Sequence, residues 1–227
     1  MNKRCDELRV FMLRHGEPKF PDGRSYLYGR TDYPLSDAGV VQAERMGAAM
    51  ASIRMDRIVA SDLVRAVRTA EIVASHQRFP VGVELDSGLR EIDMGEWDGL
   101  PKERVAEEFP ALFLRRGEDL INVAPPGGET FQELQSRVLA AFSRILEDSA
   151  EGKTLLLVAH GGVFWSIVSS LFDIPLGDLF RFPLDFCSVH VIGFNERASN
   201  RRGKFRFLRY NWAPDLFVYP DQVIRSV

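Results

Sequence analysis

Two short apolar runs that each end at a histidine constrain this chain more than any other feature. Residues 8–13 (LRVFML) lead into Arg14-His15-Gly16, and residues 154–159 (TLLLVA) lead into His160-Gly161-Gly162. Short runs with few polar positions are typical of strands that are covered on both faces, as in parallel sheets. We therefore expect two buried strands that present an imidazole at their carboxyl ends.

Helical patterns alternate with these strands and with weaker strand signals at Arg57–Ala60 and Val81–Leu85. A cap at Ser36 or Asp37 predicts a helix to about Ile53, and Ser61-Asp62 is expected to cap the next. Further expected elements are a helix from the Thr130–Glu133 capping box to about Ser149, a helix over 163–172, and a terminal strand pair, 188–194 and 204–210. This alternation favours an α/β three-layer sandwich, with a mostly parallel central sheet and helices on both faces.

Residues 89–128 interrupt the alternation. They begin as a Gly-rich acidic loop to about Leu100, continue as one or two short helices over 102–116, and end in a Pro/Gly turn over 122–128. We interpret them as a lid-like insertion over one edge of the sheet. The 227 residues otherwise fit a single domain spanning 1–227.

Composition narrows the class of partner. A formal net charge of -3 gives no general attraction for nucleic acid or acidic lipid, so neither is expected as a partner. No apolar run approaches the ~20 residues that span a bilayer, and the N-terminal residues lack the apolar stretch of a signal peptide, so we expect a cytoplasmic protein. Cys5 and Cys187 lie far apart without a Cys-x-x-Cys spacing, which indicates free thiols and excludes a zinc ribbon.

The two histidine-glycine junctions predict an anion site. Ligands bind outside the carboxyl ends of strands in open α/β sheets, so His15 and His160 are expected over one crevice. Gly16 and Gly161 would let a ligand approach the backbone, and the helix that follows would add N–H groups. Arg14, and Arg65 in the first turn of the second helix, can hold phosphate oxygens. Phosphate is favoured over metal because no third zinc ligand stands at a suitable spacing; no metal or cofactor is expected.

Each of these residues also has a structural interpretation. A strand-terminal histidine often has only a packing role. Arg65 competes with Arg68, one turn later, for the role of phosphate ligand. Glu91, which is given a role below, is one of several carboxylates in the 89–100 loop. His76 is expected to favour the C-terminal dipole of its helix, and His190 to be structural.

Six stretches carry a family resemblance: LRHGE from Leu13, YGRTDYPLSDAG from Tyr28, SDLVRAVRTAE from Ser61, LREIDMGEWDG from Leu89, PPGGET from Pro125 and VAHGG from Val158. In this order they resemble the histidine phosphatase superfamily, which includes cofactor-dependent phosphoglycerate mutases and many small phosphatases. The resemblance implies that His15 is the nucleophile, that Arg14, Arg65 and His160 bind phosphate, and that Glu91 protonates the leaving oxygen.

The mechanism that the resemblance implies also sets the charge states expected of the two histidines. His15 must be neutral to attack, with an acceptor on its other ring nitrogen, while the arginines and a protonated His160 neutralise the phosphoryl oxygens. Gly16, Gly161 and Arg30 complete the expected phosphate-binding set.

The RHGEPKF and HGGVF stretches look more like phosphatases than mutases, although Arg115-Arg116 superficially resembles the paired arginines with which mutases hold a second charge. The leading prediction is hydrolysis of a small phosphorylated metabolite through a phosphohistidine. α-Ribazole 5'-phosphate is suggested by similarity to α-ribazole phosphatases, and a sugar phosphate is the other candidate. A phosphoglycerate mutase and a non-catalytic phospholigand-binding module remain alternatives. A homodimer is possible, and the aromatic tail (Tyr210, Trp212, Phe217, Tyr219) is expected to pack on the domain.

Overall fold

A six-stranded mixed sheet forms the centre of the molecule. This computed structural model describes residues 7–22, 24–150, 153–195 and 204–214. The strand order is β4-β3-β6-β1-β7-β8. The first four of these strands are mutually parallel, whereas β7 runs antiparallel to β1 and β8 antiparallel to β7. The strands are β1 (Leu8–Arg14), β3 (Arg57–Ala60), β4 (Val83–Leu85), β6 (Thr154–Ala159), β7 (Val189–Phe194) and β8 (Phe205–Trp212).

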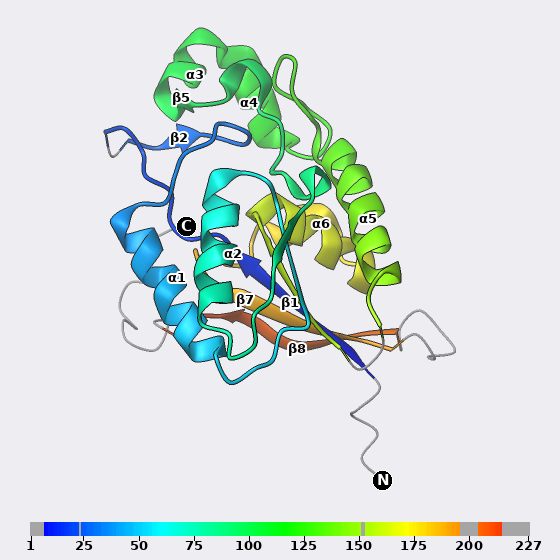
Figure 1. Cartoon of the computed structure of the whole chain (residues 1–227). Helices are drawn as coiled ribbons and strands as arrows, with labels where there is room; N and C mark the ends of the chain where they lie inside the picture. Colours follow the sequence, from blue (N-terminus) through cyan, green and yellow to red (C-terminus); the bar gives the residue numbers. More distant parts are fainter. Residues whose placement is uncertain (1–6, 23, 151–152, 196–203, 215–227) are drawn as a thin grey trace.

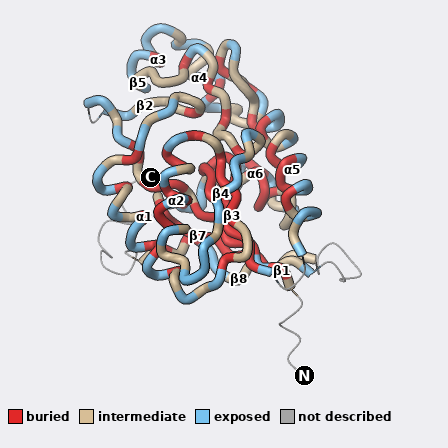
Figure 2. Tube along the Cα trace, viewed as in Figure 1, coloured by how far each residue is buried: buried red, intermediate tan, exposed pale blue. Residues whose placement is uncertain are grey.

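Helices cover both faces of this sheet, as the sequence predicted. They are α1 (Asp37–Met50), α2 (Val64–Ser75), α5 (Phe131–Glu147), α6 (Gly161–Phe172) and the short α7 (Leu176–Leu179). Alternate side chains of β1 enter two different cores: Val10 and Met12 pack with residues of α5 and α6, whereas Phe11 and Leu13 pack with residues of α1 and α2. Burial is accordingly concentrated in the sheet and on the inner faces of the helices (Figure 2).

Several boundaries differ from the sequence-based expectation. The helix α2 begins at Val64 with Leu63 as its N-cap, and neither Ser61 nor Asp62 caps it. The Val64 N–H instead donates to the Asp32 carboxylate, 2.7 Å away, from a loop that the sequence could not place beside it. The helix α6 starts two residues earlier than predicted, directly after His160, and β4 starts two residues later.

Local sequence signals were reliable elsewhere. Thr130 and Glu133 form the predicted capping box, and α5 runs from there to Glu147. The terminal strands pair as expected, with a register shift near Val191. His76 is the C-cap of α2 and contacts Glu44 at 2.6 Å.

Other residues to which the sequence analysis gave a structural role, His190 and Tyr210, pack within the domain. His190 is buried and accepts a hydrogen bond from the Asn211 backbone N–H, and its pKa falls to about 4 because of burial. Tyr210 packs on His190, with ring centroids 4.7 Å apart, and Cys187 is buried. The predictions for Cys5, Phe217 and Tyr219 lie outside the described residues. Within the described ranges, no helix is both long and apolar enough to cross a membrane.

The 89–128 segment lies beyond the end of the sheet toward which β1 points (Figure 1). It holds the expected short helices, α3 (Lys102–Glu108) and α4 (Pro110–Glu118), around the buried Trp97, whose ring lies 5.9 Å from that of Phe109. The stretch predicted as loop is more structured than expected, because Gly95–Trp97 forms a 3-10 turn. In addition, β5 (Leu100–Pro101) pairs with β2 (Tyr26–Leu27), which ties the 17–35 loop to this segment.

Candidate active site

The two histidines meet because their strands are neighbours in register. Arg14 of β1 stands opposite Ala159 of β6, and the His15 N–H donates to the Ala159 carbonyl at 3.0 Å. The next residue on each strand is therefore an imidazole at the same edge. The two ring centroids lie 5.0 Å apart, and both side chains are buried.

His15 has a defined tautomer. Its Nδ1 lies 2.7 Å from the Gly16 carbonyl oxygen. A carbonyl oxygen only accepts hydrogen bonds, so Nδ1 carries the proton and Nε2 carries the lone pair. Burial and then the charges of Arg65 and Arg14 hold the pKa of His15 well below its usual value, so the ring is neutral. This is the nucleophile-ready form that the sequence analysis required.

His160 differs from the sequence-based expectation. Its Nε2 lies 2.9 Å from Ser61 Oγ, at the end of β3. Burial, followed by the charges of Arg65, His15 and Arg14, lowers the pKa of His160 well below its usual value. The protonated His160 that the resemblance implies beside the phosphoryl oxygens is therefore not the form of the ligand-free site, because burial beside two guanidiniums disfavours the proton. A dianionic ligand would have to supply the compensating charge.

Arg65 is fully buried and aimed by the 17–35 loop. Its Nη1 donates to the Thr31 carbonyl at 2.9 Å, and its Nη2 donates to the Gly29 carbonyl at 2.6 Å. Its guanidinium carbon lies 5.2 Å from the centroid of the Tyr28 ring. Backbone N–H groups of residues 29–31 in turn donate to the Asp98 carboxylate. The loop thus fixes the cation without an acidic partner on the guanidinium itself.

Arg14 is the second guanidinium beside the histidine pair. Its Nη1 donates to the Leu184 carbonyl, and its guanidinium lies over the Phe186 ring, 4.1 Å from the centroid. Three buried nitrogen atoms of this cluster lack a hydrogen-bond partner among the described residues: Arg14 Nε, Arg65 Nε and His160 Nδ1. Buried donors are normally satisfied, so this surplus of donor capacity fits an anionic ligand.

The glycines after the histidines serve different purposes. A Cβ on Gly16 would lie 2.5 Å from the Gly39 carbonyl oxygen, and the Gly16 N–H donates to Thr69 Oγ1 at 3.0 Å. Gly16 is therefore needed for close packing against the start of α1, and its N–H is already used. Gly161 begins α6, whose N-terminus lies at this end of the sheet.

Glu91 comes to the site from the 89–128 segment. Its Oε2 accepts the Gly162 N–H at 3.1 Å, and its Oε1 accepts the Ile92 N–H at 2.9 Å. A Cβ on Gly162 would lie 2.4 Å from Oε1, so the missing side chain gives the carboxylate its room. Among the carboxylates of its loop, Glu91 is held beside the first turn of α6, immediately after His160.

Of three other arginines considered in the sequence analysis, two are engaged elsewhere and one is exposed. Arg30 pairs with Asp93 at 2.8 Å and with Glu129 at 3.2 Å. Arg116 is buried and donates to the Val123 carbonyl, and burial lowers its pKa. Arg115 is exposed on the outside of α4. Among the described residues, the hydrogen bonds of Arg116 go to Val123 and Met94, and no hydrogen bond or ion pair joins Arg115 or Arg116 to the histidine cluster.

One surface hollow lies away from these chemical groups. A hollow of about 470 Å³ is lined by Arg9, Arg54 and Lys153, near the start of β1 and β6, which is the end opposite the histidines. Arg54 and Lys153 are each paired there with Asp56 at 3.4 Å. We assign the site from the converging chemical groups, and none of them lines that hollow. Across the described ranges, no three His, Cys, Asp or Glu residues form a group that could hold a metal ion.

Sequence reasoning missed the residues that support this constellation. Ser61 contacts His160, Asp98 holds the loop that orients Arg65, and the Tyr28 and Phe186 rings flank the two guanidiniums. Ser61 stood in the matched SDLVRAVRTAE stretch, directly after a strand, which was an available signal. Tyr28 and Asp98 also stood in matched stretches, whereas Phe186 lies outside all six. The partner of each depends on contacts between distant segments.

Comparisons with known proteins agree with this geometry. The model of a family described as the histidine phosphatase superfamily (branch 1) matches residues 10–211. A probable phosphoglycerate mutase, GpmB, of Salmonella choleraesuis is 35% identical over 189 residues, which are 83% of this chain and 86% of that protein.

Solved structures include phosphatases of the same fold. The α-ribazole phosphatase from Shigella flexneri superposes with a TM-score of 0.80 at 24% identity, over 90% of this chain and 96% of that one, a likeness that concerns the fold alone. A mycobacterial glucosyl-3-phosphoglycerate phosphatase superposes with a TM-score of 0.76 at 26% identity, over 90% of this chain and 99% of that one.

Proposed function

Because this chain belongs to the histidine phosphatase superfamily, we propose that it hydrolyses phosphomonoesters through a phosphohistidine on His15, without a metal ion. The observation that carries the proposal is the state of His15: a neutral imidazole with its Nδ1 proton bound to Gly16 and its Nε2 free, beside two guanidiniums. A neutral nucleophile among cations suits attack on a phosphoryl dianion.

The first half-reaction transfers the phosphoryl group to the enzyme. Nε2 of His15 forms a bond to phosphorus while the bond from phosphorus to the ester oxygen breaks. Arg14 and Arg65 bind the non-bridging oxygens, and the phosphoryl charge favours protonation of His160, which then donates to the same group. Glu91 gives its proton to the departing oxygen, which leaves as an alcohol.

The second half-reaction regenerates the enzyme. Glu91, now a carboxylate, takes a proton from a water molecule as that water attacks phosphorus, and the bond from phosphorus to Nε2 breaks. Inorganic phosphate leaves, and His15 returns to its neutral form. The substrate we propose is a small phosphorylated metabolite; α-ribazole 5'-phosphate and sugar phosphates are the first to test.

A phosphoglycerate mutase is the second candidate, supported by the 35% identity to the GpmB protein. A mutase must bind a second anionic group of its substrate. The Arg115-Arg116 pair is divided between an exposed side chain and one bound to the Val123 carbonyl, which favours the phosphatase.

The test uses purified protein with p-nitrophenyl phosphate, with and without EDTA, and with 3-phosphoglycerate plus a bisphosphate primer. We expect chelator-insensitive release of phosphate and a phosphoenzyme that is labile in acid and stable in base. Inhibition by EDTA would contradict the metal-free mechanism. Faster mutase turnover than hydrolysis would select the second candidate, and binding of phosphate without any turnover would indicate a non-catalytic module. A panel of phosphorylated metabolites then ranks substrates by kcat/KM.

A further inference from the structure

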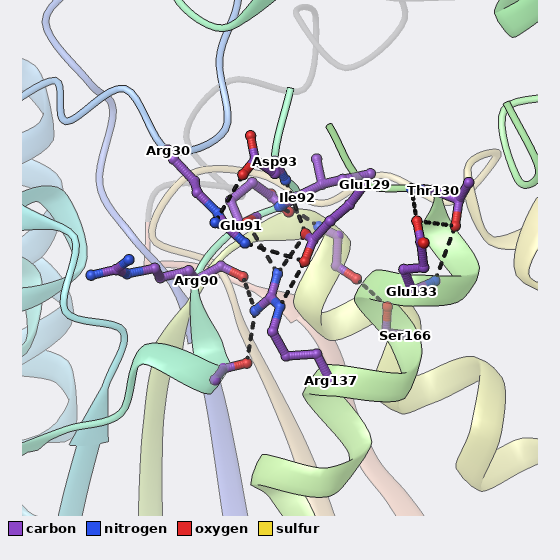
Figure 3. A network of polar contacts seen from close by, with 12 residues as sticks. Arg30, Arg90, Glu91, Ile92, Asp93, Glu129, Thr130, Glu133, Arg137 and Ser166 are labelled. Carbon is purple, nitrogen blue, oxygen red and sulfur yellow. Dashed lines mark hydrogen bonds and ion pairs between the residues drawn. The ribbon is translucent and has the colours of Figure 1, made fainter. Parts of the chain in front are cut away.

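One guanidinium on α5 holds the backbone on both sides of Glu91. Arg137 Nη1 donates to the carbonyls of Gly88 and Arg90, each at 3.0 Å, and Nη2 donates to the carbonyl of Glu91 at 3.3 Å. The Arg90 and Glu91 carbonyls belong to the two peptide groups that flank the Glu91 Cα. Arg137 therefore fixes where this side chain leaves the backbone, without contacting its carboxylate (Figure 3).

Glu129 neutralises this arginine and binds the same segment further along. It accepts from Arg137 Nε at 3.0 Å and Nη2 at 2.8 Å, a two-point pairing that sets the plane of the guanidinium. Its Oε2 also accepts the Asp93 N–H at 3.0 Å, and its own N–H donates to the Asp93 carbonyl at 2.8 Å. The segment from residue 88 to residue 93 is thus held at both ends by one ion pair.

The same ion pair is linked to the phosphate-binding side through Arg30. This residue pairs with both Glu129 and Asp93, and it belongs to the loop whose carbonyls hold Arg65. Figure 3 shows Arg30, Glu129 and Arg137 around the backbone of Glu91 and Asp93. Side chains from two separate parts of the sequence, the 17–35 loop and residues 129–137, therefore converge on the carboxylate segment.

We propose that Arg137 and Glu129 are positioning residues for Glu91, which set the place of its carboxyl group relative to the leaving oxygen. This inference rests on the proposed function, in which Glu91 is the general acid. Within the part of the chain that the structure describes, the carboxylate itself is held by two N–H groups, those of Ile92 and Gly162, so its direction depends on the backbone from which it starts. Loss of the Arg137 bonds would free that backbone and weaken protonation of the leaving group.

The test compares two esters that need the acid to different degrees. Glycerol 2-phosphate has an alkoxide leaving group that requires protonation, whereas 2,4-dinitrophenyl phosphate releases a stable phenolate without it. We expect Arg137→Ala to lower kcat/KM for glycerol 2-phosphate by roughly 30-fold more than for the aryl ester, within the range of general acid catalysis. Glu91→Gln should show the same selectivity to a greater degree. Glu129→Gln, which keeps the side-chain shape, should shift the ratio in the same direction by roughly 5-fold.

The matched control is Arg144→Ala. Arg144 lies on the same helix, two turns further, and pairs with Asp86 at 3.2 Å on the exposed surface, so the ratio of the two esters should stay at the wild-type value. If Arg137→Ala and Glu129→Gln lower kcat/KM equally for both esters, so that the ratio of the two values is unchanged, the pair only stabilises the fold. That result would overturn the positioning role. Failure of the wild-type protein to hydrolyse either ester would instead contradict the proposed function, and the positioning role with it. If Arg137→Ala does not fold, the ratio of the two esters in Glu129→Gln decides whether the pair positions Glu91.

Discussion

The two sides of the catalytic cluster are held by different kinds of bond. On the strand-end side, His15 and His160 follow adjacent parallel strands, and the sheet's own backbone hydrogen bonds set their spacing. On the acid side, residues 88–93 have little regular structure and depend on side-chain bonds from Arg137 and Glu129. The nucleophile is therefore placed by the fold as a whole, whereas the acid is placed by a few replaceable side chains. Substitutions on the acid side can change chemistry while leaving the fold intact.

The largest effect should come from the strand-end side. His15→Ala removes the atom that accepts the phosphoryl group, and we expect kcat/KM to fall by at least about 10⁴-fold, as for other nucleophile deletions. Steady-state assays with an aryl phosphate and trapping of the phosphoenzyme would measure this. His76→Ala, at the partly exposed C-cap of α2, is the control and should keep full activity. Formation of a phosphoenzyme by the His15→Ala protein would contradict the assignment of His15 as the nucleophile.

Acid should destabilise the two sides over different pH ranges. The pKa values of His15, His160 and His190 are lowered in the fold, first of all by burial, so the unfolded chain binds protons that the folded chain does not. Stability should therefore fall as the pH drops below about 6.5, by about 1 kcal/mol per histidine between pH 6.5 and 5.5.

Glu129 should respond only at lower pH. Burial alone would raise its pKa, but the bonds from Arg137 and the Asp93 N–H lower the pKa overall, so its contribution is lost only as the pH falls below about 4.5. Urea unfolding at intervals from pH 7.5 to 4, in phosphate-free buffer, would separate the two ranges. A constant unfolding free energy between pH 7.5 and 5 would contradict the buried neutral histidines.

A smaller effect is expected where the two sides touch, at Gly162. The added methyl group of Gly162→Ala would lie 2.4 Å from Glu91 Oε1 and force the carboxylate to move. We expect kcat/KM for an alkyl phosphate to fall by about 10- to 100-fold, because displacements of about 1 Å can cost that much. Gly177→Ala, where an added Cβ meets nothing within 4 Å, should be neutral. Equal activities of the two variants would mean that Glu91 tolerates displacement.

The smallest effect is expected outside both sides. Arg115 is exposed, so Arg115→Ala should leave kcat and KM unchanged for every phosphate ester tested. Arg116→Ala loses the bond to the Val123 carbonyl and should lower the unfolding free energy by about 1–3 kcal/mol, measured by urea denaturation. A specific rise in KM for a substrate with two anionic groups, in Arg115→Ala, would revive the mutase alternative.

The sequence by itself determined the alternation of strands and helices and the two histidines at adjacent strand ends. These features follow from local patterns: apolar runs, the capping box at Thr130 and Glu133, and the glycines after His15 and His160. The family resemblance added Glu91, which position alone could not distinguish from the neighbouring carboxylates, and it selected Arg65 over Arg68.

Only the tertiary structure decided the charge states and the supports of the site. His160 is neutral because folding buries it beside two arginines, and Arg30 is drawn into pairs with Asp93 and Glu129 rather than left available for phosphate. Ser61, Asp98 and Arg137 act through partners that lie 99, 68 and 46 residues away in the chain. Hydrogen bonds and desolvation depend on which atoms meet in space, and local periodicity carries no information about such distant contacts.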